Sequence, residues 1–162
     1  MTMNIEDKTI IGRAERVILP DHGTHLIPAK VDTGADVSSI WASNISEQDG
    51  CLEFVLFNET SEYYTGHVIR IDAANYRLTR IANSFGHKEL RYVVKMRITI
   101  LGRTIKATFT LADRSKKTYP ILLGRRMLKN KFLVDVTKGT PLLAEEKAKL
   151  EQLHIALSLD EG

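Results

Sequence analysis

The feature that most constrains the fold is a long alternation of apolar and polar residues in the middle of the chain. From Leu90 to Leu101 every second residue is apolar, and the residues between them are mostly Arg, Lys or Thr. The same pattern returns from Thr104 to Leu111, after the dipeptide Gly102-Arg103. A period of two is typical of a strand with one buried face, and a short Gly-containing connection is typical of a hairpin turn. The segment therefore predicts a long β-hairpin.

Shorter apolar segments elsewhere also predict strands, and the sequence between Asp72 and Asn75 predicts the turn that joins two of them. A short helix is predicted from Arg125 to Asn130. Short strands at close spacing, with no long helical pattern between them, are typical of a closed or sandwiched all-β domain. The predicted strands are Arg16–Leu19, Ile27–Val31, Leu52–Phe57, His67–Ile71, Tyr76–Ala82, Tyr119–Leu123 and Phe132–Val136.

The last part of the chain differs in character. Thr140-Pro141 predicts a helix start, with a hydroxyl cap and proline at the first helical position. Leucines follow at mostly helical spacing among Glu and Lys residues. We expect an amphipathic helix packed on its own domain or on a partner subunit. The chain is accordingly divided into one main domain, residues 1–139, and a helical tail, residues 140–162.

Composition limits the cellular setting. The 162 residues contain one cysteine, Cys51, so no internal disulfide can form, and this fits a reducing cytoplasm. Neither an apolar run long enough to span a membrane nor a secretory signal is found in the sequence. Between Arg77 and Val134 there are fifteen Lys or Arg residues but two acids, and the rest of the chain has eight basic residues and eighteen acids. This split predicts a positive face and an anionic partner, although exposed strand faces are often rich in Lys and Arg as well.

The chemistry is indicated by an apolar strand that runs directly into Asp32-Thr33-Gly34. Aspartic peptidases need a carboxylate held rigidly beside a second carboxylate, a hydroxyl residue that can lock the loop, and a glycine that lets backbone approach the acid. Two neighbouring carboxylates share one proton. The ionised one then activates water while the protonated one polarises the peptide carbonyl. The motif also occurs by chance in Asx-type turns.

A second element, far downstream, favours the catalytic interpretation. Leu122-Leu123-Gly124-Arg125 precedes the predicted short helix, and together with Asp32-Thr33-Gly34-Ala35 it resembles the motifs of the retropepsin family. The resemblance implies an all-β, retropepsin-like closed barrel with a flap hairpin from Leu78 to Lys95, whose tip is at 83–86. It also implies a structural pair between Asp36 and Arg125. Because the chain has a single Asp-Thr-Gly, the resemblance implies a homodimer in which each subunit supplies Asp32.

A closer resemblance extends from Ile11 to Val136. The segments 11–15, 29–35, 89–94, 109–114, 122–126 and 132–135 are similar to the bacterial family labelled as ATP-dependent zinc proteases, which includes the RimB proteins associated with the RimK ligase. Asp36 stands where that family commonly has Lys or Arg, and Trp41 stands where it often has His. The resemblance implies a hydrolase that trims α-linked poly-glutamate tails, with a RimK-like ligase system as an associated partner.

The basic central region suits a polyanionic substrate. The substrate contacts we expect are Ser38, Ser84 at the flap tip, Arg91, Arg114 and Lys117, although Arg91, Arg114 and Lys117 are equally typical of solvated strand and loop charges.

We expect neither a metal nor ATP, and therefore no cofactor, because the chain has no H-E-x-x-H motif and no phosphate-binding glycine loop. Two alternative functions remain open. One is an endopeptidase that processes an ordinary protein. The other is a barrel without catalysis that binds nucleic acid or another polyanion. Nucleic acid is the weaker choice, because the aromatic residues fall mostly on the apolar side of the predicted strands, where they cannot stack on bases.

Overall fold

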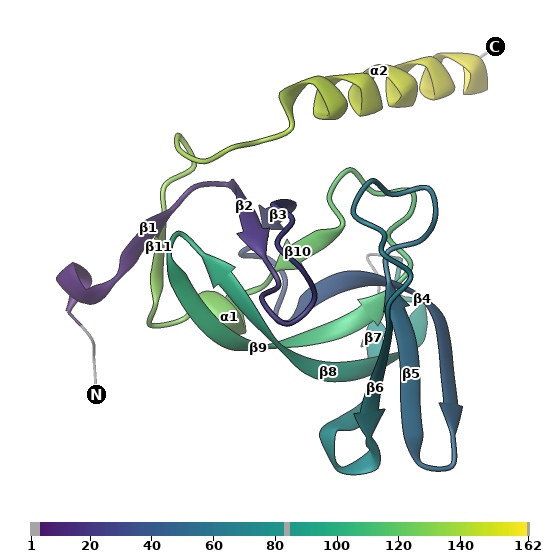
Figure 1. The fold of residues 1–162 in the computed structure, drawn as a ribbon. Helices are drawn as coiled ribbons and strands as arrows, with labels where there is room; N and C mark the ends of the chain where they lie inside the picture. Colours follow the sequence, from purple (N-terminus) through teal and green to yellow (C-terminus); the bar gives the residue numbers. More distant parts are fainter. Residues whose placement is uncertain (1–3, 83–84, 162) are drawn as a thin grey trace.

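The computed structural model describes residues 4–82 and 85–161, and its fold is built mainly from β-strands (Figure 1). The strands, in chain order, are β1 (Thr9–Ile11), β2 (Ala14–Ile18), β3 (Ile27–Val31), β4 (Ser38–Gln48), β5 (Cys51–Leu56), β6 (Val68–Asp72), β7 (Tyr76–Ala82), β8 (Lys88–Ile100), β9 (Arg103–Ala112), β10 (Ile121–Leu123) and β11 (Phe132–Val134). The helical elements are η1 (Ile5–Asp7), η2 (Ala73–Asn75), α1 (Arg125–Leu128) and α2 (Leu143–Asp160).

The main sheet closes on itself. Its strands follow the order β10-β3-β2-β8-β9-β4, and β10 pairs with β4 as well as with β3. The strands β5 and β6 extend the sheet beyond β4, and β7 pairs with β8 outside the ring. The predicted all-β, retropepsin-like architecture is confirmed, but the ring carries these outlying strands and is therefore not a simple closed barrel.

The predicted central hairpin is formed by β8 and β9, which pair antiparallel from Val93 opposite Thr110 to Ile100 opposite Arg103. The turn consists of Leu101 and Gly102, both with positive φ, so it lies one residue earlier than predicted. Positive φ at two successive residues matches the right-handed twist of the strands in a tight hairpin. This hairpin forms one wall of the ring and also extends outward through β8.

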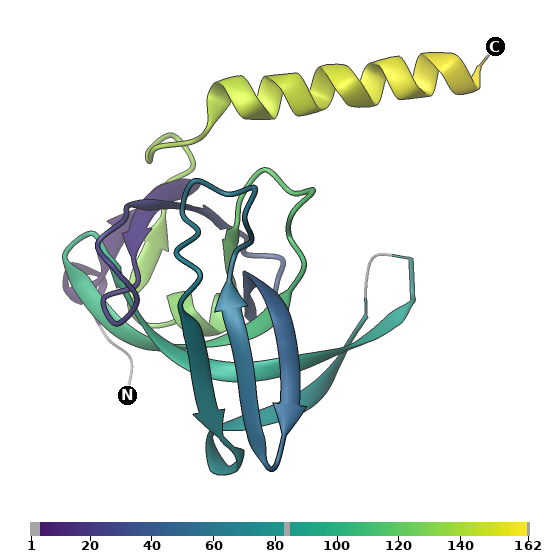
Figure 2. The ribbon, with the colours of Figure 1, turned by 45° about the vertical axis from the view of Figure 1, so that its right-hand side comes forward.

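The expected flap corresponds to the second hairpin of β8, formed with β7. Leu78 pairs with Tyr92, and Ala82 pairs with Lys88. Figure 2 shows this hairpin projecting away from the ring on the side opposite β1 and β11. Of the predicted tip, residues 83 and 84 lie outside the described residues, and Phe85 is exposed. A mobile tip at 83–86 remains a prediction.

The core lies inside the ring. Ile40 of β4 and Phe109 of β9 are fully buried there, and Phe54 of the outlying β5 is fully buried in the same hydrophobic cluster. Trp41, the departure from the family pattern, is also buried and packs edge-on against Phe57, with ring centroids 6.1 Å apart. The polar half of β4 leaves the core and continues outward beside β5. This strand was missed by the sequence prediction.

The two ends of the main domain meet in a small parallel sheet of β1 and β11, in which Ile10 is opposite Leu133. Gly12 follows β1 at a close backbone approach: a Cβ atom there would lie 2.2 Å from the carbonyl oxygen of Lys138. Only glycine permits that approach. The chain beyond β11 is therefore held against the start of the domain before the tail begins.

The tail forms the predicted helix, but not at the predicted start. Helix α2 begins at Leu143 without a side-chain cap, and the backbone N–H of Thr140 instead donates to the carbonyl of Ala14 at 2.7 Å. The helix then runs beyond the main sheet (Figure 1). Its leucines are more than half exposed, so the expected packing against its own domain is not observed. The exposed leucines are Leu143, Leu150, Leu153, Leu157 and Leu159.

Polar contacts fasten the first turns of α2 to the domain. Glu146 accepts two hydrogen bonds from Arg13, at 2.9 and 3.0 Å, and one from the Tyr119 hydroxyl at 2.6 Å. The same hydroxyl accepts a hydrogen bond from the backbone N–H of Leu142 at 2.8 Å. Lys149 donates to the carbonyl of Lys116 at 2.9 Å. The loop at residues 113–120 is therefore bound to the tail.

Candidate active site

The Asp32 carboxylate lies where β3 ends and the chain turns out of the ring. The backbone N–H of Asp32 donates to the carbonyl of Leu123 on β10 at 2.9 Å. The carboxylate oxygen Oδ1 accepts a hydrogen bond from the Gly34 N–H at 3.0 Å, and the Asp32 carbonyl accepts one from Ala35 at 3.2 Å. The side chain is partly exposed. The turn therefore fixes the acid while leaving it open to solvent.

The downstream Leu122-Leu123-Gly124-Arg125 motif packs against this turn and is hydrogen-bonded to it. Gly124 donates its backbone N–H to the Ser38 hydroxyl at 3.0 Å, and the N–H of Arg125 donates to the Ala35 carbonyl at 2.8 Å. A Cβ atom at Gly124 would lie 2.7 Å from the carbonyl carbon of Val37. The φ of Gly124 is −92°, so the glycine is required here by the close approach of two backbone segments. The two sequence motifs therefore form one braced unit.

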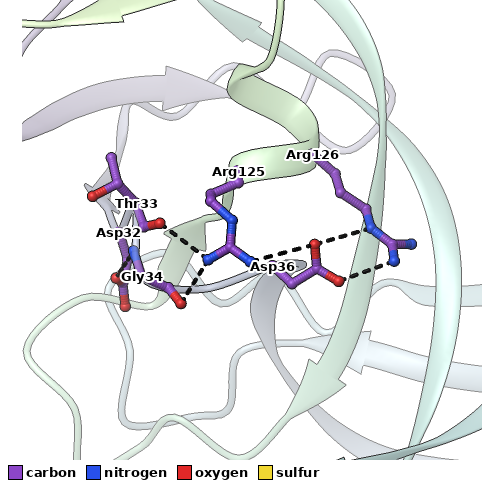
Figure 3. A network of polar contacts seen from close by, with 6 residues as sticks. All are labelled: Asp32, Thr33, Gly34, Asp36, Arg125 and Arg126. Atoms are coloured by element: carbon purple, nitrogen blue, oxygen red, sulfur yellow. Dashed lines mark hydrogen bonds and ion pairs between the residues drawn. The ribbon is translucent and has the colours of Figure 1, made fainter.

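Figure 3 shows that the charged residues around this unit pair differently from the prediction. Asp36 contacts Arg126 most closely, with its Oδ2 2.9 Å from a guanidinium nitrogen, whereas Arg125 lies 3.8 Å from Asp36. Arg125 donates instead to the carbonyls of Thr33 and Gly34, at 3.2 and 2.9 Å. The predicted Asp36–Arg125 pair is thus only the weaker of two contacts, and Arg126 was missed.

Two of the predicted substrate residues lie together beside the Asp32 turn. Arg91 of β8 and Arg114 line a cavity of about 360 Å³ that also borders Gly34 and Ala35. Burial lowers the pKa of Arg114, the charge of Arg91 lowers it further, and the charge of Asp32 raises it. The electrostatic field of Asp32 therefore reaches the guanidinium group of Arg114.

The other predicted substrate residues are placed elsewhere. Ser38 is 1% exposed, and its hydroxyl is occupied by the N–H of Gly124, so it braces the turn. Lys117 borders a separate cavity with Trp41 and Tyr63. Ser84 lies outside the described residues. Ser39 was missed: it borders the cavity of Arg91 and Arg114, and its sequence context gave no signal for that position.

No three His, Cys, Asp or Glu side chains within 4–82 and 85–161 come together as a metal ion would require. In the same residues, no helix is both long enough and apolar enough to cross a bilayer.

A closed ring of strands, with Asp-Thr-Gly at the end of an inner strand and a Gly-Arg segment bracing it before a short helix, defines a retropepsin-like protein. Comparison with protein families leads to a narrower assignment. The model of the RimB-like family, described as retropepsin-like aspartic endopeptidase RimB, matches residues 10–140. The chain belongs to this family.

Curated relatives carry a different name. A probable alpha-L-glutamate ligase of Shewanella halifaxensis is 32% identical over 153 residues, which cover 92% of this chain and 33% of the relative. A protein of the same name from Desulfotalea psychrophila is 33% identical over 138 residues, covering 79% of this chain and 28% of the relative. The chain thus spans about a third of the length of these relatives. Their ligase name describes those longer proteins.

A solved structure supports the fold. The crystal structure of Lpg0085, a protein of unknown function from Legionella pneumophila, superposes with a TM-score of 0.61 at 27% identity. The match covers 80% of this chain and 95% of that chain.

Proposed function

We propose that the protein is an aspartic endopeptidase that acts as a homodimer, in which Asp32 from each subunit completes the active site. The observation that carries this proposal is the Asp32 turn, which is braced by Gly124 and Arg125 and leaves the carboxylate partly exposed. The chain has one Asp-Thr-Gly motif. Since peptide hydrolysis of this type requires two carboxylates, a two-fold dimer is the simplest complete site.

The surface beside the turn supports a subunit contact. Thr33 borders a concave region of about 580 Å³ that is lined by the apolar Leu128, Phe132 and Val134 and by four charged residues, Asp36, Arg125, Arg126 and Lys129. Apolar side chains next to the catalytic turn suit a second copy of the chain, because burial of such a surface favours association. In the dimer, one Asp32 would be ionised and would activate water, while the other would be protonated and would polarise the scissile carbonyl.

The proposed substrate is an α-linked poly-glutamate tail or a similarly acidic peptide. Two observations support it: the basic excess between Arg77 and Val134, and the glutamate-ligase name of relatives that contain a matching segment. A ligase that adds such tails and a peptidase that removes them would act on the same products. A RimK-like ligase is therefore the proposed associated enzyme, in the reducing cytoplasm that the single cysteine suits.

The test uses purified protein and fluorescent peptides that end in oligo-α-glutamate, with products read by mass spectrometry. Replacement of Asp32 by Asn should reduce cleavage to background while the fold is retained, and a chelator should leave the wild type active. Cleavage of neutral peptides alone would favour processing of an ordinary protein. Polyanion binding with no cleavage of any peptide would favour the non-catalytic barrel.

Mixing experiments test the shared site. If subunits exchange at random, an equal mixture of wild type and Asp32→Asn should retain about a quarter of the wild-type activity, whereas independent monomers would retain about a half. Sedimentation velocity at the assay concentration should find a dimer. Full activity of a species that sediments as a monomer would contradict the proposal.

A further inference from the structure

The cavity beside the Asp32 turn is enclosed by two parts of the chain. Gly34 and Ala35 form one side, and Ile81 and Ala82, at the end of β7 in the proposed flap, form another. Its volume of about 360 Å³ falls in the range of small-ligand sites. A peptide that reached Asp32 would pass directly beside this cavity, so one of its side chains could enter.

Two residues that line the cavity each have one buried polar atom without a hydrogen-bond partner among the described residues. These atoms are the Nε of Arg91 and the Oγ of Ser39. Within the described part of the chain, one further buried side-chain atom of this kind is Nδ1 of His22, a residue that lines a different cavity. Buried polar groups in proteins are nearly always paired, and leaving one unpaired costs about 1–3 kcal/mol. Two such residues in the lining of one cavity indicate a place where a bound ligand would supply the missing acceptor.

The charge of the cavity indicates the sign of that ligand. The side chain of Arg91 is 22% exposed, and one of its guanidinium nitrogens donates to Glu89, on the outer part of β8, at 3.3 Å. Arg114 is fixed by donation from its Nε to the carbonyl of Tyr119 at 2.9 Å. The two positive charges act on each other within a partly desolvated space. An anion bound between them would offset both the repulsion and the loss of solvation.

We propose that Arg91, Arg114 and Ser39 form a subsite that binds one side-chain carboxylate of the substrate beside the scissile bond. A carboxylate is the chosen ligand because the planar fork of an arginine matches its two oxygens, and a serine hydroxyl can donate to the same group. The subsite deepens the proposed peptidase function, on which it rests, by assigning selection for a glutamate side chain to named residues. Lys117, in a separate cavity, has no part in it.

The test is a glutamine scan of an oligo-α-glutamate peptide, in which each Glu is replaced in turn. At one position the replacement should lower kcat/KM about 10- to 100-fold, as expected for loss of a charge-assisted hydrogen bond. Arg91→Met and Arg114→Met should abolish that discrimination, so that the Glu and Gln peptides are cleaved equally. Ser39→Ala should reduce it. Lys117→Met is the matched control and should retain the wild-type ratio.

The ratio of Glu to Gln cleavage separates recognition from a general loss of activity or fold. Ser39→Ala is the mildest change, so it keeps the test usable if an arginine variant unfolds. Retention of the full Glu preference in both Arg91→Met and Ser39→Ala would overturn the subsite. A peptide amidated at its C-terminus should be cleaved as well as the free acid. If amidation prevented cleavage and the internal Gln replacements had no effect, the subsite would bind a terminal carboxylate, and the side-chain assignment would be overturned.

Binding to the Asp32→Asn protein distinguishes failure of the subsite from failure of the peptidase. Calorimetry should find that this protein binds the all-Glu peptide more tightly than the peptide with Gln at the selected position, and that Arg91→Met removes the difference. Such binding without hydrolysis by the wild type would refute the peptidase and support the subsite. Hydrolysis by the wild type that does not depend on Arg91 would support the peptidase and refute the subsite.

Discussion

Replacement of Ser38 by Ala should destabilise the protein, because the Ser38 hydroxyl accepts the N–H of Gly124 in a buried setting. The donor–acceptor distance is 3.0 Å, and Ser38 is 1% exposed. Without the hydroxyl, the Gly124 N–H loses its partner where water cannot easily replace it, which costs about 1–3 kcal/mol. At about 2 kcal/mol, the melting temperature of a domain of this size should fall by roughly 4–8 °C.

The neighbouring serine provides the control. Ser39 is 5% exposed on the same strand, but its hydroxyl has no partner among the described residues. Its replacement by Ala removes an unsatisfied buried group, so the free energy of unfolding should not fall and should rise by about 1–3 kcal/mol. Urea unfolding of both variants at one protein concentration measures the difference and excludes effects of association. Equal losses, or a stable Ser38→Ala with a raised KM, would refute the bracing role and return Ser38 to the substrate contacts.

Further predictions concern the arginines of α1 and the tail. Arg125→Met should lower kcat on the order of tenfold, because it frees the carbonyls of Thr33 and Gly34. Arg126→Met should change activity and stability little, because its pair with Asp36 is more than half exposed. Steady-state kinetics measure both effects, and equal losses of kcat would contradict the different roles assigned to the two arginines. Hydrogen bonds from Arg13, and secondarily from Tyr119, hold the pKa of Glu146 below its ordinary value. The stability that this anchor contributes is therefore present above the ordinary glutamate pKa and is lost as pH falls below about 4. The opening of α2 measured by hydrogen exchange should therefore increase as pH falls below about 4, and Glu146→Gln should remove this pH dependence of opening.

The parts of the fold that could be predicted are those in which one face of a strand is buried. The alternation in β8 and β9 directly reports such a face. Strand β4 gave no comparable pattern, because its first residues lie between β9 and β10 and are buried on both faces, including Ser38 and Ser39. Its second half is polar and exposed. The tail helix was predicted from leucine spacing, but its start was misplaced because Thr140 is held by Ala14 before the helix begins.

The candidate site was predictable where a motif carries its own geometry. Asp32, Thr33 and Gly34 form a local turn, and Gly124 faces it because β10 pairs with both β3 and β4. Side-chain contacts between residues far apart in the sequence could not be predicted from the sequence. Arg125 and Arg126 are adjacent, and only the direction of each side chain from α1 decides which one meets Asp36. Similarly, Arg114 and Lys117 are three residues apart in one loop but border different cavities.

The contacts of Tyr119 determine how a truncated version of the protein should be chosen. Its carbonyl fixes Arg114, and its hydroxyl is engaged by Glu146 and Leu142. A shortened version ending where the family match ends, at residue 140, would keep every residue of the Asp32 turn but remove both tail partners of Tyr119. Such a truncation would free the side chain of Tyr119, whose carbonyl accepts the hydrogen bond from Arg114. Measurements of substrate preference are therefore best made with α2 in place, even though no leucine of that helix reaches the core within the described residues.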